Sequence, residues 1–325
     1  MEKKYLTIYS PYYNQPELLK FNFDLYSSFK KELLDKAHFM IVDDGSQVKP
    51  AYDIAKEYTK KLDISLYKID VDIPWNMPEA NNIAFKEIKT PWVLRTDMDH
   101  FLDEKQMLSA VLGAYKQHAP IGYLYFFGKR FVFKGENAKD GKAYPINQLH
   151  ENSYIIHKDD YWRIGGYNEC YSGNYGWDDV DFFVRAGAPE RYKRIIPDLR
   201  IGKEFFKEHN LDGRMGLPGH IESGNISEKL VEQWKIDNKE KTAKAYAEYE
   251  AEKEISFFKM DVMKGGKTTN LSIFNNPHLG NYYNIDKYEG GAKNQYHSGY
   301  IKNMNKFVHF FNSLDRFKHT YTKLI

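Results

Sequence analysis

Short apolar runs alternate with helically spaced apolar residues over the first 95 or so positions of this 325-residue chain. We expect strands at 5–9, 38–42, 64–69 and 91–96, with helices in the three intervals between them. This alternation predicts an α/β fold with a mainly parallel sheet and right-handed crossovers. Ligands of such sheets bind beyond the carboxyl ends of the strands, so side chains at those ends are the first candidates for a site.

Acidic residues stand at two of these expected strand ends. Asp43 and Asp44 follow the second strand, and Asp97 and Asp99 follow the fourth. Carboxylates at the end of a buried strand are costly unless they bind a cation or are solvated in a cleft. Two carboxylates one residue apart suit a hard divalent ion that also holds a diphosphate.

A second acidic cluster, Asp178-Asp179-Val180-Asp181, follows a loop rich in glycine and aromatic residues at 173–177. We expect a helix to begin near Asp179, where the helix dipole favours the ionised carboxylate. Such a group can act as a general base in the same cleft. Together the two acidic clusters predict a metal-assisted transfer from a nucleotide-activated donor.

Composition narrows the class of protein. The net charge of +2 is too near zero to indicate a polyanion partner by itself, and the mean hydropathy of -0.68 predicts a soluble protein. Cys170 is the single cysteine, so no intramolecular disulfide can form and a reducing compartment is expected. We find no signal peptide and no apolar run long enough to span a membrane, which predicts a cytoplasmic location.

The character of the sequence changes after residue 225. We expect a catalytic domain at 1–225 and a helical and loop-rich extension at 226–325 that packs on it, with a long helix at 227–255 and a final helix at 303–322. That final helix would place Phe307, Phe310, Phe311, Leu314, Phe317 and Tyr321 on one face.

Basic residues accompany these C-terminal aromatic side chains. Residues 286–325 hold seven Lys or Arg against three Asp or Glu. Three interpretations stay open: an amphipathic helix that packs on the catalytic domain, a DNA-binding surface, or a surface that lies on an anionic membrane. The basic members beside aromatic residues are Lys302, Lys306, Arg316, Lys318 and Lys323.

Four segments in order resemble a GT-A fold glycosyltransferase, similar to family 2 and to the galactosyl- and N-acetylgalactosaminyltransferases. They are YSPYYNQPELL at the first strand, VDDGS at 42–46, TDMD at 96–99 and GGYNECYSGNYGWDDVDFFVRA at 165–186. The resemblance covers roughly residues 4–205. It implies a Rossmann-like, mainly parallel GT-A sheet with flanking helices, followed by the mostly helical C-terminal extension.

The resemblance also implies roles on the donor side of a site. Asp44 would contact the nucleoside, and Asp43 would hold the loop or the ribose. Asp97 would touch the ribose or the sugar, and Asp99 would bind Mn²⁺ or Mg²⁺ together with Asp97. The remaining residues expected to contact the donor are Ser10 and Tyr12 in the base pocket and Asn81 on the helix after the 74–78 loop.

On the acceptor side the resemblance implies that Asp179 is the base, that Asp178 replaces a preceding glutamate, and that Trp177 packs over the acceptor. One departure concerns the metal. Lys203 stands where many metal-dependent relatives carry a histidine ligand, and a protonated lysine cannot ligate. Lys203 could instead neutralise the diphosphate, with His209 or His220 as the missing ligand.

The expected activity is transfer of a hexose-type sugar from a nucleotide-sugar donor, UDP first, to a hydroxyl acceptor with inversion. The acceptor would be a glycan, a lipid-linked sugar or a modified DNA base. Three alternatives stay open: a retaining transferase, a DNA-modifying transferase that acts on hydroxylated bases, and a non-catalytic nucleotide- or glycan-binding module. The sequence does not determine the sugar, the acceptor or the oligomeric state.

Overall fold

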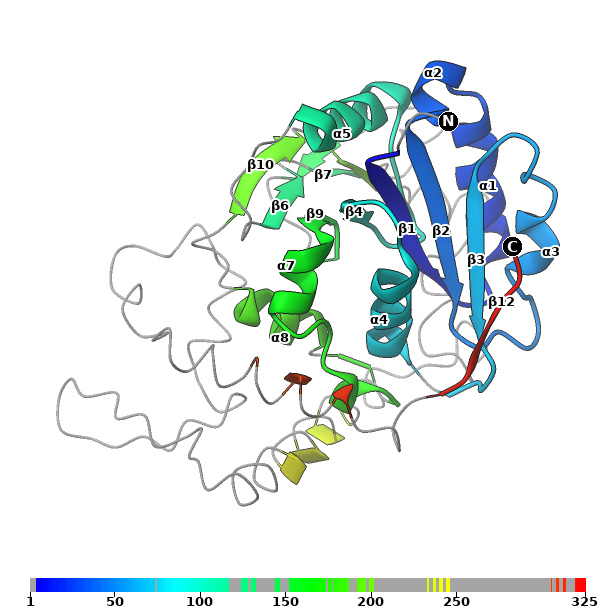
Figure 1. The fold of residues 1–325 in the computed structure, drawn as a ribbon. Helices are drawn as coiled ribbons and strands as arrows, with labels where there is room; N and C mark the ends of the chain where they lie inside the picture. The colour runs from blue at the N-terminus through cyan, green and yellow to red at the C-terminus, as the bar shows by residue number, and fades with distance from the viewer. Residues whose placement is uncertain are drawn as a thin grey trace, which may run out of the picture.

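The computed structural model describes most of the N-terminal two thirds of the chain and its last residues. These are 4–73, 75–116, 124–127, 130–132, 144–146, 152–173, 175–176, 178–186, 192–196, 199–201 and 319–325, with single residues between 233 and 245 and between 305 and 313. This part forms a large mixed sheet, a smaller sheet and flanking helices (Figure 1). The expected α/β class is therefore confirmed.

The large sheet has the strand order β10-β6-β9-β4-β1-β2-β3-β12. Its centre is four parallel strands, β1 (Leu6–Tyr12), β2 (Ala37–Asp43), β3 (Ile64–Ile69) and β4 (Trp92–Arg95), which confirm the four predicted strands. Beside β4, β9 (Tyr154–His157) runs antiparallel and pairs in turn with β6 (Leu124–Phe127). The outer strands are β10 (Tyr192–Ile196), parallel to β6, and β12 (Tyr321–Lys323), antiparallel to β3.

The smaller sheet has the order β5-β11-β7-β8. Its strands are β5 (His100–Phe101), β7 (Arg130–Val132), β8 (Tyr144–Ile146) and β11 (Leu199–Ile201). Because β5 begins directly after Asp99, the turn that carries Asp97 and Asp99 is held at one end by the large sheet and at the other by the smaller one.

Helices cover both faces of the large sheet. The connections β1-β2 and β2-β3 step one way and β3-β4 steps back, so right-handed crossovers place α1 (Pro16–Ser27) and α3 (Tyr52–Ala55) on one face and α4 (Met77–Glu87) on the other (Figure 1). The remaining helical segments are α2 (Lys31–Leu34), α5 (Glu104–Lys116), α7 (Lys158–Arg163), the 3₁₀ helix η1 (Glu169–Tyr171) and α8 (Asp178–Arg185).

Two cores result from this layering. On one face, buried aliphatic and aromatic side chains of α1, α3 and α5 pack against the strands. On the other, α4 meets α7 through Phe85 and Tyr161, whose rings stack at 3.6 Å, and Tyr167 stacks on Phe182 of α8 at 4.5 Å. Many of the chain's aromatic residues thus fill the core, and the stacked rings fix α8 and its acidic first turn against α4.

The first strand is longer than the sequence predicts. We expected it to end at residue 9, but β1 continues through Pro11 to Tyr12. The Tyr9 carbonyl faces β4 and accepts from Thr96 N–H, so Pro11, two residues on, faces the same side. The bond that Pro11 cannot donate would reach the carbonyl of Thr96, directly after β4 ends at Arg95.

The C-terminal prediction is partly wrong. Tyr321, expected on a helical face, lies in β12 opposite Ile69, because the outer edge of β3 offers unpaired backbone groups that a strand can satisfy. The Tyr321 hydroxyl also donates to Glu87 of α4. Residues 305, 308, 309 and 312 are helical, whereas most of 226–318 lies outside the described residues, so the domain boundary at 225 stays a prediction.

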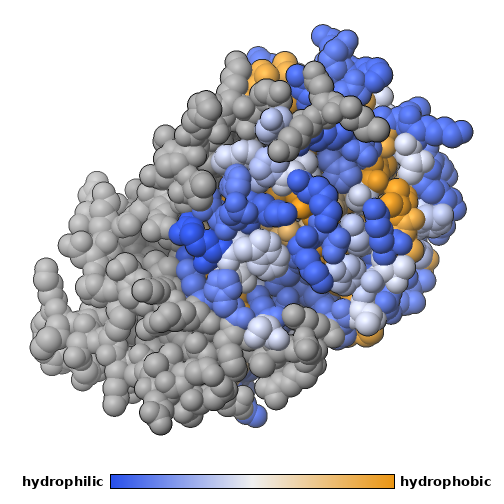
Figure 2. Space-filling view, in the orientation of Figure 1, coloured by the Kyte–Doolittle hydropathy of each residue, from blue (hydrophilic) through white to orange (hydrophobic). Residues whose placement is uncertain are grey.

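The described surface is largely polar. On the face seen in Figure 2 it is mostly hydrophilic with small hydrophobic areas. Among the described residues, no helix has the length and apolar character needed to cross a bilayer. Of the C-terminal basic residues, Lys323 places its ammonium nitrogen 5.9 Å from the ring centre of Tyr67. Contact of this segment with DNA or with a membrane stays a prediction. The cytoplasmic location also stays a prediction.

Candidate active site

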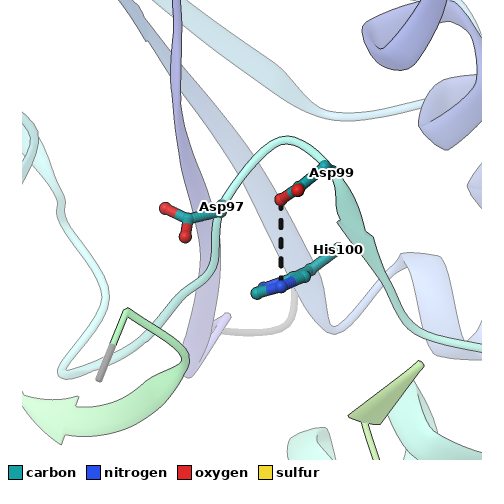
Figure 3. A group of neighbouring side chains, drawn as sticks. All are labelled: Asp97, Asp99 and His100. Atoms are coloured by element: carbon teal, nitrogen blue, oxygen red, sulfur yellow. Dashed lines mark ion pairs between the residues drawn. The ribbon is translucent and has the colours of Figure 1, made fainter. Parts of the chain in front are cut away.

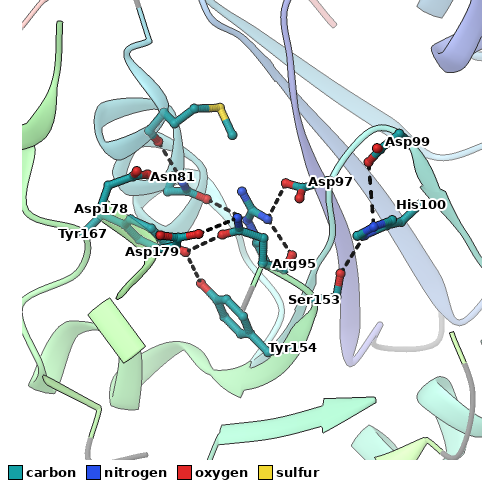
Figure 4. A network of polar contacts seen from close by, with 12 residues as sticks. Asn81, Arg95, Asp97, Asp99, His100, Ser153, Tyr154, Tyr167, Asp178 and Asp179 are labelled. Atoms are coloured by element: carbon teal, nitrogen blue, oxygen red, sulfur yellow. Dashed lines mark hydrogen bonds and ion pairs between the residues drawn. The ribbon is translucent and has the colours of Figure 1, made fainter. Parts of the chain in front are cut away.

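Polar side chains from neighbouring strands gather at the edge of the sheet where the parallel strands end. Asp43 and Asp44 come at the end of β2, and Asp97 and Asp99 follow β4. From the opposite side α8 contributes Asp178 and Asp179 in its first turn. In Figure 4, Arg95 lies between Asp97 on one side and Asp178 and Asp179 on the other.

Asp43 holds the loop that follows β2. Its Oδ1 accepts from Ser46 N–H at 2.9 Å and its Oδ2 from Ala51 N–H at 2.8 Å. Burial raises the pKa of Asp43, and the bonds from Ser46 and Ala51 oppose that shift. The positive φ of Gly45 belongs to the same turn, where an added Cβ would clash with the backbone of Val71 and Asp72. Asp43 therefore holds this loop through backbone N–H groups, and a contact of Asp43 with the ribose stays a prediction.

Asp44 is 3% exposed, and only one of its oxygens has a partner among the described residues. Its Oδ2 accepts from Asn76 N–H at 2.9 Å, whereas Oδ1 accepts no hydrogen bond from them. Burial raises the pKa of Asp44 well above its usual value, and the nearby Asp43 adds to the shift. A buried acceptor without a donor is costly, which is typical of a position that a ligand N–H or O–H completes.

The turn after β4 brings Asp97, Asp99 and His100 together (Figure 3). One ligand atom of each lies within 4.8 Å of the others, and His100 Nε2 is 3.8 Å from Asp99 Oδ1. Ser153 Oγ lies 2.8 Å from His100 Nδ1, on the other side of the ring. The sequence did not single out His100, although it directly follows the Asp-x-Asp motif.

Two carboxylates and an imidazole at this spacing fit Mn²⁺ or Mg²⁺, which take oxygen ligands and, for Mn²⁺, also nitrogen. The side chains of Asp97 and Asp99 are 23% and 18% exposed, so both can reach an ion bound at the edge of the sheet. Asp97, Asp99 and His100 would hold it. The expected roles of Lys203 and His209 stay predictions, because both residues lie outside the described part of the chain.

Arg95, the last residue of β4, is 1% exposed. Its Nη1 lies 2.6 Å from Asp97 Oδ1, and its Nε donates to Asn81 Oδ1 at 3.3 Å. The Asp97 charge raises the pKa of Arg95 against the opposing effect of burial. This buried cation offsets part of the negative charge that the acidic side chains concentrate here, and no motif of the sequence predicts it.

The acidic pair at the start of α8 is asymmetric. Asp178 is 5% exposed and accepts from the Trp75 indole N–H at 3.4 Å, while Asp179 Oδ2 accepts from Asn152 Nδ2 at 3.1 Å. Burial, aided by the charge of Asp179, raises the pKa of Asp178 to about 7. Tyr175 meets the Trp75 ring at 4.5 Å, edge to face, beside the pair.

The other expected donor contacts have structural partners. The Tyr12 ring lies in the core and its hydroxyl donates to the Lys49 carbonyl at 2.5 Å. Asn81 bridges the Met77 carbonyl and Arg95 from within α4. Ser10 is a buried residue of β1. Contacts of these three residues with a donor stay predictions, and Trp177 lies outside the described residues.

The sequence of residues 7–173, just over half of the chain, matches the family model described as Glycosyl transferase family 2. The chain therefore belongs to glycosyl transferase family 2, as the resemblance of its motifs predicted. The match ends before the acidic pair of α8. A search of curated proteins gave no significant match.

Solved structures with a related chain trace share little sequence. S. aureus TarS 1-349 has a TM-score of 0.45 at 14% identity, with 62% of each chain covered. The same fragment in complex with UDP-GlcNAc gives 0.44 at 11%, covering 62% of this chain and 64% of that one. The mannosyltransferase PcManGT from Pyrobaculum calidifontis, in complex with GDP-Man and Mn²⁺, gives 0.43 at 16%, covering 62% and 58%. The chain thus spans less than two thirds of these structures.

Proposed function

We propose that this chain transfers a hexose-type sugar from a nucleotide-sugar donor, UDP first, to a hydroxyl acceptor with inversion at the anomeric carbon. Family membership supports the reaction class. The observation that carries the proposal is the placement of the Asp97–Asp99 turn and the Asp178–Asp179 pair on either side of buried Arg95 (Figure 4). A leaving diphosphate and an acceptor hydroxyl need groups of these two kinds on opposite sides of one sugar.

Asp44 supports binding of the nucleotide. Its Oδ1 is buried and accepts no hydrogen bond from the described residues, while Asn76 fixes Oδ2. A nucleobase N–H or a ribose O–H would supply the donor that Oδ1 needs. Asp43 and Tyr12 contribute indirectly, because their bonds to Ser46, Ala51 and Lys49 shape the loop beside Asp44.

Asp97 and Asp99, with His100, would hold Mn²⁺ or Mg²⁺. The ion supplies the positive charge that stabilises the leaving diphosphate. Arg95 keeps Asp97 in place and lies between the two carboxylate groups of the site. On the acceptor side, Asp179 takes the proton of the attacking hydroxyl, with Asn152 holding its carboxylate.

The test is hydrolysis of UDP-, GDP-, CMP- and dTDP-sugars, each with Mn²⁺ and with EDTA. Turnover of one donor that requires Mn²⁺ is the expected result, and Asp99→Ala should abolish it. Binding of a nucleotide without turnover of any donor, with or without an added acceptor, would instead support the non-catalytic binding module. Equal turnover in EDTA would move charge neutralisation from the ion to Lys203.

The base and the stereochemistry need separate tests. Asp179→Asn should lower transfer by at least about 100-fold, the usual range for loss of a positioned base. Full activity in this variant would remove Asp179 from the role. The anomeric configuration of the first product, read by NMR, separates inversion from the retaining alternative.

The acceptor remains one of three classes: a glycan, a lipid-linked sugar or a modified DNA base. A salt-sensitive mobility shift with duplex DNA would support the DNA-modifying alternative. Co-sedimentation with anionic liposomes would support a lipid-linked acceptor at a membrane surface.

A further inference from the structure

Asn152 and Ser153 lie directly before β9, at the same sheet edge where β4 ends. β9 runs antiparallel to β4, with Tyr154 opposite Arg95. The residues that enter β9 therefore lie beside those that leave β4, which include Asp97 and Asp99. No expected role in the site involves these two residues.

Asn152 contacts both sides of the site. Its carbonyl accepts from Arg95 Nη1, the nitrogen that also pairs with Asp97. Its side-chain Nδ2 donates to Asp179 Oδ2 at 3.1 Å, and its Oδ1 accepts from the Tyr167 hydroxyl at 3.4 Å. An ionised carboxylate only accepts hydrogen bonds, so Asn152 directs its N–H₂ group at Asp179 and leaves Oδ1 for the Tyr167 hydroxyl, which can donate.

Ser153 contacts the metal-binding group. It is 0% exposed, and its hydroxyl lies 2.8 Å from Nδ1 of His100, which is itself 2% exposed. Nε2 is thereby turned toward Asp99, 3.8 Å from its Oδ1. A partner on the far nitrogen is what orients a histidine and selects its tautomer when the near nitrogen ligates a metal.

We propose that Asn152 and Ser153 are positioning residues that hold the two halves of the site in register, Asn152 by orienting Asp179 and Ser153 by orienting His100. They are adjacent in sequence and share one backbone segment, which Arg95 ties to Asp97. A displacement of this segment moves the base and the metal group together. The role rests on the proposed function but is tested partly without it.

The Ser153 arm measures binding of Mn²⁺ alone, by electron paramagnetic resonance. Ser153→Ala removes the partner of His100 Nδ1 and should weaken Mn²⁺ binding about 10-fold, as expected for loss of an outer-shell partner. Ser153→Thr keeps a hydroxyl and should bind as the wild type does. The matched control is Ser109→Ala on α5, whose hydroxyl donates to the Lys105 carbonyl of its own helix.

The Asn152 arm uses Asn152→Asp, which keeps the size of the side chain and an oxygen for Tyr167. It replaces the donor to Asp179 by an oxygen that repels it. We expect a lower Tm in Asn152→Asp and recovery when Asp179→Asn is added, because the pair then regains one donor and one acceptor. This double-mutant cycle needs no activity.

Steady-state kinetics, with the donor that the hydrolysis panel identifies, complete the test. Asn152→Asp should lower kcat by at least about 10-fold while the donor KM changes less than about threefold, because a displaced base weakens the transition state and leaves the ground state bound. Wild-type Mn²⁺ affinity in Ser153→Ala, or independent Tm effects in the Asn152–Asp179 cycle, would overturn the proposal. If the wild type turns over no donor, the proposed function fails, while these two binding and stability readouts still decide the positioning role.

Discussion

The indole N–H of Trp75 donates to Oδ1 of Asp178 at 3.4 Å. The next residue, Asn76, donates its backbone N–H to Asp44, so a single loop contacts both the carboxylate assigned to the nucleotide and the acidic pair assigned to the acceptor. Trp75 has a φ of 47°, a left-handed conformation that side-chain-bearing residues rarely adopt. Strain of this kind persists where surrounding contacts over-determine it, which is frequent at functional sites.

The raised pKa of Asp178 predicts a pH-dependent stability. Its folded-state value of about 7 lies above the unfolded value of about 3.9. The native state therefore binds this proton more tightly, and the resulting stabilisation is complete below about pH 4 and lost as the pH rises through about 7. Asp178→Asn, which stays neutral and keeps an oxygen for Trp75, should gain stability relative to the wild type between pH 5 and pH 8.

Urea unfolding at the two pH values measures this difference. A change of a few kcal/mol is expected, since one pKa unit corresponds to about 1.4 kcal/mol. The exposed Asp53→Asn on α3 is the control and should run parallel to the wild type. Parallel curves for Asp178→Asn as well would mean that Asp178 is ionised throughout this range.

The neighbours Asp43 and Asp44 should respond differently to the same change. Asp43 uses both oxygens for backbone N–H groups, and an asparagine at this position could accept only one of these bonds, so Asp43→Asn should cost about 1–3 kcal/mol of stability. Asp44→Asn should fold normally, because burial disfavours the charge, but bind UDP at least about 10-fold more weakly. Calorimetric titration with UDP beside urea unfolding gives both values. Equal UDP affinity in Asp44→Asn and the wild type would remove Asp44 from the nucleotide site.

Alanine substitutions at two glycines of the 165–186 segment distinguish the cost of backbone strain from the cost of steric crowding. Both have positive φ, but a Cβ on Gly166 would clash with Asn82 Oδ1, whereas a Cβ on Gly173 would meet nothing within 4 Å. Asn82 also accepts from Tyr167 N–H, so Gly166→Ala disturbs the packing that holds α8. We expect Gly166→Ala to lose about 3 kcal/mol or more and Gly173→Ala about 1 kcal/mol. Similar unfolding midpoints for both would show that the Asn82 contact relaxes freely.

His319 should stabilise the N-terminus of α4 from the end of the described chain. Its Nδ1 and its backbone N–H lie 2.6 and 2.7 Å from the carboxylate of Glu79, which is 4% exposed. His319→Ala removes one partner of a buried carboxylate and should cost about 1–3 kcal/mol. His309→Ala, which affects an exposed ring 3.4 Å from the Arg163 carbonyl, is the control and should change stability by less than about 0.5 kcal/mol. A loss no larger than that of the control would contradict the role.

The four central strands and several strand-end carboxylates could be predicted because they depend on local signals. Alternating strand and helix patterns placed Asp43, Asp44 and Asp97 at one edge of the sheet. Asn152 and Ser153 were missed because they precede a strand. Since β9 is antiparallel to β4, the start of β9 lies at the edge of the sheet where β4 ends. In the sequence, Arg95 is one polar residue in an apolar run. Its burial depends on Asp97 close by and also on the distant Asn81 and Asn152, which no local pattern connects to it.

The helix predicted at 303–322 shows the limit of periodicity. Tyr321 fits the helical spacing of the aromatic residues before it, but its conformation is determined by β3, which lies far earlier in the chain. Hydrogen bonds between distant segments leave no periodic signal in either of them. The same holds for Trp75, whose partner Asp178 lies 103 residues away.

Pro11 in β1 limits the length of the neighbouring strand, β4. The ladder between β1 and β4 ends with Thr96 N–H on the Tyr9 carbonyl, and the next bond would need an N–H from residue 11. Proline has no N–H, so the hydrogen-bond ladder between β1 and β4 does not continue past Thr96. The missing N–H of a residue in the first strand thus helps to determine where, far along the chain, the turn with Asp97 and Asp99 begins.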